Sequence, residues 1–306
     1  MKQSTNRILL VKPAHFAYNE QTAPSNAFQN AEMVDSDSVQ EKALLEFKGL
    51  ASALGSIGVE VIEIEDSEFP VTPDAVFPNN WLSLHEDGTM VLYPMCAPNR
   101  RLERRKDILD WLSDKYSINE VIDLSHSEEQ GQFLEGTGSI VFDHLSKVAY
   151  ACISQRTDRS LFENLCKRLN YRPICFIAVD PTGKAIYHTN VMMCIGTGFA
   201  VICLESIPSV EKRNWVREEL NRTQHEIIEI SLAQMARFAG NMLEVETGKG
   251  ERALVLSQTA FDSLSAQQKA VLAQYCELLP IGIPTIEQAG GGSVRCMMAE
   301  VFLSPH

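Results

Sequence analysis

The sequence lacks the features that mark membrane, secreted and nucleic-acid-binding proteins. No apolar run approaches the ~18 residues of a membrane-spanning helix. The apolar run at residues 8–11 is too short for the core of a signal peptide, so we expect a cytoplasmic protein. Lys and Arg number 27 against 40 Asp and Glu, and the pI is near 5.0. Such an acidic chain predicts no nucleic-acid and no membrane partner.

Basic blocks and metal-binding cysteine patterns are also missing. The densest basic stretch, residues 100–106, is interrupted by Glu103 and is expected to form a solvated helix face. The eight cysteines form no CxxC pair and no zinc-finger spacing, so we expect reduced thiols and no metal. Most of them, like Cys152 and Cys194, lie in apolar runs and are expected in the core. The glycines at 136 and 138 are too few for a dinucleotide site, so no cofactor is expected.

An internal repeat organises the 306 residues. Amphipathic helical patterns recur at 39–54, 102–115, 159–169, 211–222 and 265–276, and a short apolar strand follows each one. After each strand comes a turn and then a motif that opens another strand. The motifs begin at Asp74, Glu135, His188, Gly240 and Cys296, with spacings of 61, 53, 52 and 56 residues. No linker interrupts the pattern, so we expect one catalytic domain over residues 1–306.

The repeat predicts a closed ring of α/β units. A single unit cannot bury its own apolar face, so five units should stack around an axis. A companion strand follows each of the first four motif strands, but the fifth motif is followed by the end of the chain. The N-terminal strand at 7–11 is expected to supply the missing companion by pairing with a strand that begins at Met297. Asp74, Glu135, His188 and Cys296 would then converge on one central cavity.

These residue types suit covalent hydrolysis. Cys296 follows the flexible segment GGGSVR and would be the nucleophile; the alternative is a core cysteine after a flexible turn. His188 would be the general acid and base, worth roughly 10²–10⁴ in rate, and Glu135 would orient it. The alternatives are a structural histidine at a strand end and a surface carboxylate.

The motifs PDAVFPNNW, EGTGS, HTNV and GGGSVRC, in this order, resemble the pentein superfamily of guanidino-modifying enzymes. The opening KPAHFAYNEQTAPSNAFQ is similar to one branch, the citrulline-utilisation hydrolases that are often labelled amidinotransferases. The resemblance covers nearly the whole chain. It implies a five-bladed α/β propeller of ββαβ units with pseudo-fivefold symmetry. It also implies that Cys296 is the nucleophile, with His188 and Glu135 as its partners.

The sequence departs from the arginine-processing members of that superfamily at two positions. Asn80 and Asn190 stand where those enzymes carry carboxylates that grip a cationic guanidinium. An amide keeps a donor and an acceptor but no charge, so it suits a neutral ureido group better. Asp74 and Glu135 remain as anions near the reacting group.

The sequence therefore predicts a cysteine hydrolase that cleaves the ureido C–N bond of citrulline, giving ornithine, ammonia and carbon dioxide. The alternatives are an arginine dihydrolase or deiminase, an amidinotransferase, and a non-catalytic binding protein of the same fold. Arg295, Asn26 and Asn79 are candidates for holding the amino-acid end of a small ureido or guanidino substrate. A homo-oligomer is compatible with the sequence.

Overall fold

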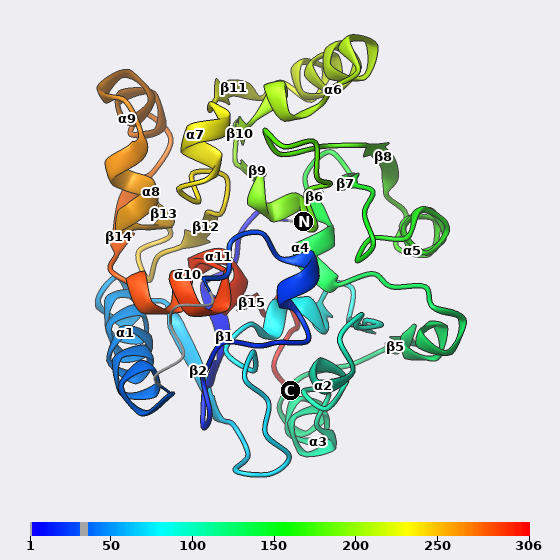
Figure 1. Cartoon of the computed structure of the whole chain (residues 1–306), viewed down its shortest axis with the longest axis vertical. Coiled ribbons are helices and arrows are strands. Elements are labelled where there is room, and N and C mark those ends of the chain that lie inside the picture. The colour runs from blue at the N-terminus through cyan, green and yellow to red at the C-terminus, as the bar shows by residue number, and fades with distance from the viewer. Residues whose placement is uncertain (1, 31–35) are drawn as a thin grey trace.

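The described residues form five three-stranded sheets around a central axis. The computed structural model describes residues 2–30 and 36–306, without the side chains of 36 and 37. The longer helices lie on the outside of the ring (Figure 1). This is the closed five-bladed α/β propeller that the repeat and the resemblance predict.

Each sheet has the same internal order. An inner strand pairs antiparallel with a middle strand, which pairs parallel with an outer strand. The inner strands are β3 (Leu82–Leu84), β6 (Val141–Asp143), β9 (Met193–Gly196), β12 (Leu243–Glu246) and β15 (Ala299–Glu300). The middle strands are β4 (Thr89–Leu92), β7 (Val148–Cys152), β10 (Phe199–Ile202), β13 (Arg252–Ser257) and β1 (Arg7–Lys12). The outer strands are β5 (Glu120–Asp123), β8 (Arg172–Phe176), β11 (Glu226–Glu229), β14 (Glu277–Ile281) and β2 (Glu60–Glu65).

Burial explains the composition of the strands. Inner and middle strands such as β9 and β10 are buried along their whole length, so they consist almost entirely of apolar residues. The outer strand β2 mixes Glu with Val and Ile because it is only partly buried. The central strands are therefore continuous apolar runs, whereas the outer strands carry charged residues among their apolar ones.

A helix or helix pair connects the middle and outer strands of each unit. These helices are α1 (Ser36–Ser56), α3 (Lys106–Lys115), α5 (Arg159–Arg168), α6 (Val210–Arg222) and the pair α8 (Gln258–Ser263) and α9 (Ala266–Leu272). The helix expected from residue 102 instead begins at Lys106, because Pro98 opens a separate turn, α2 (Pro98–Arg101). The last expected helix ends at Leu272 rather than at 276.

The N-terminal strand closes the ring as predicted. Strand β1 pairs antiparallel with β15, with Leu9 opposite Ala299, and parallel with β2. The final motif strand begins at Ala299 and not at Met297, because residues 294–297 form the helical turn α11 (Val294–Met297). That turn carries Cys296.

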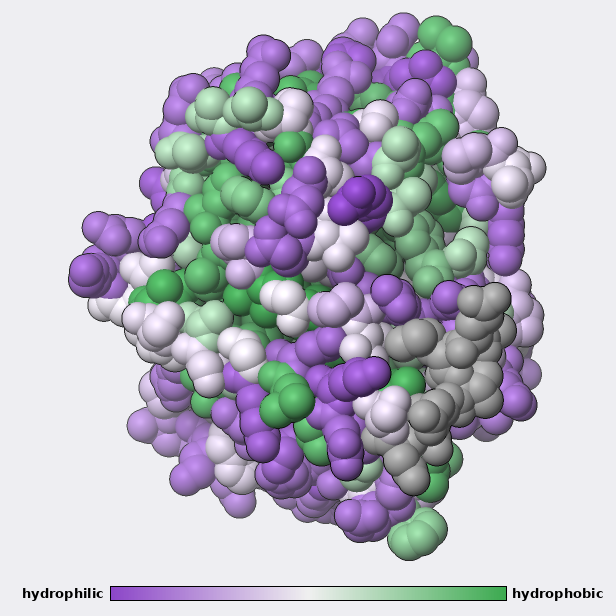
Figure 2. Space-filling model, turned by 60° about the vertical axis from the view of Figure 1, so that its left-hand side comes forward, coloured by the Kyte–Doolittle hydropathy of each residue, from purple (hydrophilic) through white to green (hydrophobic). Residues whose placement is uncertain are grey.

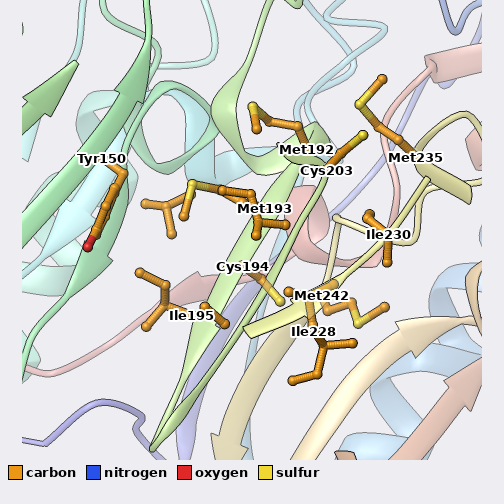
Figure 3. Packing of buried hydrophobic residues seen from close by; sticks show 14 of the residues in the cluster. Tyr150, Met192, Met193, Cys194, Ile195, Cys203, Ile228, Ile230, Met235 and Met242 are labelled. Carbon is orange, nitrogen blue, oxygen red and sulfur yellow. The ribbon is translucent and has the colours of Figure 1, made fainter. Parts of the chain in front are cut away.

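The core lies between the sheets and their helices. On β9, Met193 and Ile195 point towards the side of Tyr150, whereas Cys194 points towards Met242 and Ile228 (Figure 3). Cys152, Cys166, Cys194, Cys203 and Cys276 are buried, as expected, whereas Cys96 and Cys175 are half-buried. Polar residues dominate the face drawn in Figure 2, with apolar side chains mostly in its hollows. None of the described helices is both long and apolar enough to cross a membrane.

Candidate active site

Short helical turns position the motif residues. Glu135 immediately precedes α4 (Gly136–Ser139), and His188 immediately precedes the 3-10 turn Thr189–Val191. The turn Pro78–Asn80 follows Asp74, and α11 contains Cys296. These turns pack against one another although they come from different units. The fold thus brings together residues that lie far apart in the sequence.

One narrow pocket collects most of the expected site. Cys296, His188, Asp74 and Asn80 line it, and all four are buried. Its other lining residues are Thr22, Asn26, Phe77, Arg100, Arg156, Tyr187 and the glycines 290–292.

His188 and Glu135 form a buried pair behind the pocket. Nε2 of His188 lies 2.8 Å from Oε2 of Glu135. Burial lowers the pKa of His188 to about 4, although the Glu135 carboxylate opposes this. Burial raises the pKa of Glu135, but Arg156 and His188 outweigh it and bring the value to about 2. The pair is therefore a neutral imidazole beside a carboxylate at neutral pH.

The same pair fixes the tautomer of His188. A carboxylate can only accept, so Nε2 carries the imidazole proton and Nδ1 carries the free lone pair. Glu135 is itself held, because its Oε1 accepts the backbone N–H of Cys96 at 2.9 Å. Nδ1 of His188 is thus the basic atom of the site.

Gly138 allows two polar side chains to meet. A Cβ at this position would lie 2.5 Å from Nδ2 of Asn80 and 2.7 Å from Nδ1 of His188. Both atoms therefore approach the same point of the α4 backbone. The second glycine of EGTGS is required by this close approach and not by an unusual φ angle.

Two amides face the thiol of Cys296. Nδ2 of Asn190 lies 3.4 Å from Sγ, and Nδ2 of Asn241 lies 3.3 Å from it. Asn190 was expected to contact the substrate, but it does not line the pocket of Cys296 and instead borders a second cavity. Asn241 was not anticipated, although it follows Gly240 in the fourth motif.

The placement of Arg295 contradicts the expectation that it holds the substrate. Its Nη1 donates to the carbonyl of Met298 at 2.9 Å, and its Nη2 donates to Glu300 at 2.8 Å. Arg295 borders the second cavity and not the pocket of Cys296. The alternation of neighbouring residues around α11 explains this, because adjacent side chains on a helical turn point in different directions.

Asn79 and Asn26 have structural contacts. Asn79 donates to Thr137 Oγ1 at 3.2 Å and accepts from Asn80 at 3.0 Å, and it does not line the pocket. Asn26 does line the pocket, but its amide donates to the Gly290 carbonyl and accepts from the Phe28 backbone. Its contacts fasten the N-terminal loop to the glycine-rich segment before Cys296.

Sequence reasoning missed Arg100. The expectation of a solvated face at 100–106 is wrong for Arg100 and Glu103, which are both buried. Arg100 Nε lies 2.8 Å from Glu103 Oε1, and Arg100 Nη1 donates to Oδ1 of Asn80 at 2.6 Å. Pro98 was the available signal, because it begins the separate turn α2.

Arg156 is the second cation that the sequence did not reveal. Its Nη2 donates to the Thr22 carbonyl at 2.8 Å, and its Nη1 lies 3.5 Å from Oε2 of Glu135. Its guanidinium also stacks over Tyr187, with 5.0 Å between Cζ and the ring centroid. Arg156 stands in a loop with no recognisable motif, so only the fold places it at the pocket.

Asp74 presents an unused oxygen. Its Oδ2 accepts from Asn19 at 2.7 Å, whereas its buried Oδ1 has no hydrogen-bond partner among the described residues. Burial raises the pKa of Asp74, and the nearby Arg100 opposes this rise. Within the described ranges no three His, Cys, Asp or Glu side chains are placed to hold a metal ion.

The motif order, the propeller and the pocket agree with one family of enzymes. The family model of eukaryotic N,N-dimethylarginine dimethylhydrolases matches residues 12–303. The chain belongs to this family. It is therefore a member of the pentein superfamily of guanidino-modifying enzymes, as the motifs indicate. The comparison with curated proteins found no match to this chain.

Solved structures show the same fold at low sequence identity. ArgZ, a cyanobacterial arginine dihydrolase of the ornithine–ammonia cycle, is 18% identical with a TM-score of 0.76 over 96% of this chain. The match spans 40% of that ArgZ chain. The N-terminal domain of ArgZ, solved with substrate bound, is 17% identical with a TM-score of 0.76. That match covers 96% of this chain and 97% of the ArgZ domain. Dimethylarginine dimethylhydrolase from Pseudomonas aeruginosa, complexed with citrulline, is 14% identical with a TM-score of 0.68, over 97% of this chain and 99% of that one.

Proposed function

We propose that this protein is a cysteine hydrolase that cleaves the ureido C–N bond of citrulline. Family membership and the pocket containing Cys296 and His188 support a hydrolase acting on a guanidino or ureido carbon. The choice of a ureido substrate rests on the orientation of one amide, that of Asn80.

The Asn80 amide offers a donor to the substrate. Its Oδ1 accepts from Arg100 at 2.6 Å, and a guanidinium can only donate, so the assignment of oxygen and nitrogen is fixed. One N–H of Nδ2 donates to Asn79 Oδ1 at 3.0 Å, and the second remains for a substrate. Nδ2 lies near Gly138, where His188 Nδ1 also approaches. A donor at this place matches the carbonyl oxygen of a ureido group. A guanidinium, which carries only donors, would meet donor against donor.

The proposed reaction proceeds through a covalent adduct. Neutral His188 takes the proton of the Cys296 thiol, and the thiolate adds to the ureido carbon. The C–N bond to the ornithine side chain breaks as the protonated His188 gives its proton to the leaving amine. Water, deprotonated by His188, then attacks the S-carbamoyl group and frees the thiolate. The carbamic acid that leaves decomposes to ammonia and carbon dioxide.

The buried arginines support recognition of an amino acid. Arg156 lines the pocket, is buried and faces Glu135 at 3.5 Å, which is a longer contact than the 2.8 Å between Arg100 and Glu103, so it is the better candidate for contact with an α-carboxylate. Arg100 is neutralised by Glu103 and serves to orient Asn80. We therefore place the carboxylate of the substrate at Arg156 and its ureido group between Cys296 and Asn80.

Arginine dihydrolysis is the second candidate, and Asp74 favours it. The free Oδ1 of Asp74 can accept from a guanidinium N–H and partly offset the loss of hydration of that cation. An arginine dihydrolase would carry its substrate through a ureido intermediate in the same pocket. ArgZ, which has the same fold, is an arginine dihydrolase.

Competition kinetics separates the candidates. The purified protein is supplied with citrulline, arginine and dimethylarginine, and ammonia, ornithine and methylamines are followed over time. We expect ornithine and ammonia from citrulline, with a higher kcat/KM than for either guanidino compound. Faster turnover of arginine, with ornithine as the end product, would replace the first candidate by the second. Turnover of dimethylarginine to citrulline alone would reject both.

A further inference from the structure

Asn241 reaches Cys296 from a different unit of the propeller. It lies between α7 (Leu232–Met235) and β12, and it is 1% exposed. Its Oδ1 accepts the backbone N–H of Arg295 at 3.0 Å. Because a backbone N–H can only donate, the Asn241 amide nitrogen must be the atom that faces Sγ.

Every polar atom of the Asn241 side chain is in use. Nδ2 lies 3.3 Å from Sγ of Cys296 and also donates to the Asn190 carbonyl at 3.1 Å. Asn190 differs, because its buried Oδ1 has no hydrogen-bond partner among the described residues. The Asn241 amide is thus held in one orientation on both sides, while the Asn190 amide is not.

An amide N–H that faces a sulfur stabilises the thiolate more than the thiol. Hydrogen bonds to a charged acceptor are about twice as strong as those to a neutral one. The amide nitrogen of Asn241 cannot accept a proton from the thiol, so the contact offers little to the neutral form. Its bond to the Arg295 backbone also ties the amide to the turn that carries the nucleophile.

We propose that Asn241 is a positioning residue that holds Sγ of Cys296 and favours its ionised form before the substrate arrives. This inference rests on the proposed role of Cys296 as the nucleophile. The pocket of Cys296 is also lined by these charged or titratable residues: Asp74, Arg100, Arg156, Tyr187 and His188. Arg295 is paired with Glu300. The Asn241 variants leave all these groups in place.

Alkylation of Cys296 in the free protein tests the inference without a substrate. Iodoacetamide is applied between pH 5 and 10, and the peptide that contains Cys296 is quantified by mass spectrometry. Asn241→Asp keeps the acceptor for Arg295 N–H but sets an anion beside the sulfur. We expect the alkylation rate at pH 7 to fall by about 10- to 100-fold, the loss of one charge-assisted hydrogen bond. The midpoint of its pH profile should move upward.

Asn241→Ala should shift the pH profile of Cys296 alkylation in the same direction but by a smaller amount. If the Asp variant does not fold, the Ala variant provides the test. Asn164→Asp, on the exposed side of α5, is the matched control and should leave the profile unchanged. In turnover, kcat should fall with the alkylation rate while KM changes little. An unchanged profile in a folded Asn241 variant would overturn the inference. Persistent activity in Cys296→Ser would instead reject the proposed function.

Discussion

His188 Nε2 lies 2.8 Å from Oε2 of Glu135, although the two residues are 53 positions apart in the chain. The contact joins the second and third units of the propeller and is shielded from water on all sides. It places the imidazole proton on Nε2 and leaves Nδ1 as the basic atom. The following predictions depend on this geometry.

Replacing His188 by Ala should lower kcat by roughly 10²–10⁴, the usual contribution of a general acid and base. Glu135→Gln should lower kcat by less, because the imidazole is kept but no longer held in one tautomer by a carboxylate. Steady-state kinetics measures both. His126→Ala, at an exposed position, is the control. A His188→Ala variant within threefold of the unmodified protein would contradict the assignment.

Cys296→Ser should abolish turnover while the substrate still binds. The alcohol is a far weaker nucleophile than the thiolate, but it occupies nearly the same space. Ammonia release measures the first effect, and calorimetric titration with citrulline measures the second. Cys175→Ser, at a half-buried cysteine outside the pocket, should keep full activity. More than a few per cent of activity in Cys296→Ser would rule out the covalent mechanism.

Gly138→Ala should cost most of the activity and about 1–3 kcal/mol of stability, because the added methyl group overpacks a buried site. The added methyl group would fall 2.5 Å from Nδ2 of Asn80 and 2.7 Å from Nδ1 of His188, so both side chains must move. A shift of about 1 Å in such groups can cost a hundredfold in rate. Gly49→Ala in α1 is a matched control, since its new Cβ meets nothing within 4 Å. Equal activity in the two variants would show that these atoms do not act on the substrate.

Asn80→Asp should shift the substrate preference from citrulline towards arginine. One carboxylate oxygen would pair with Arg100, and the other would replace the Nδ2 donor that faces the ureido oxygen. We expect the ratio of kcat/KM for citrulline to that for arginine to fall by at least tenfold, since a lost hydrogen bond becomes a repulsive contact. Competition between the two substrates gives this ratio directly. A ratio that rises would refute the proposed orientation of the Asn80 amide.

The contribution of the buried histidines to stability should decrease as the pH falls from about 6.5 towards 4. Buried carboxyl groups such as Glu103, whose pKa burial raises to about 7, act in the opposite direction, so the histidine contribution is measured as a difference between variants. Burial lowers the pKa of His188 and of His85 to about 4, whereas the unfolded chain binds these protons near 6.5. The unfolded state therefore binds more protons in this range, and stability is fully present only above it. Each imidazole contributes at most about 3 kcal/mol. Urea unfolding at pH 7, 6 and 5 measures the loss, and His85→Gln should reduce its slope.

Much of the fold could be predicted because each repeat unit has a recognisable local pattern of an amphipathic helix and short apolar strands. Continuous apolar runs mark strands buried on both faces, and the glutamates among the apolar residues of β2 mark a strand that is partly exposed to solvent. The pairing of β1 with β15 could be predicted because four motif strands are followed by a companion strand and the fifth is not, which leaves the N-terminal strand as its partner. The ends of helices were less certain, as at Lys106, because a single proline shifts where a helix begins.

The sequence by itself determined the ring of five units, and it predicted Cys296, His188 and Glu135 as the catalytic residues because the repeat places them at equivalent positions. Only the tertiary structure decided which other side chains face them. Arg156 lies in a loop outside the repeated motifs, so nothing periodic in the chain marks it. Asn241 stands in the fourth motif, but only the fold shows that its amide faces Cys296. Arg295 adjoins the nucleophile in sequence but pairs with Glu300. Neighbours along a helical turn point in different directions, so proximity in sequence does not fix proximity of side chains.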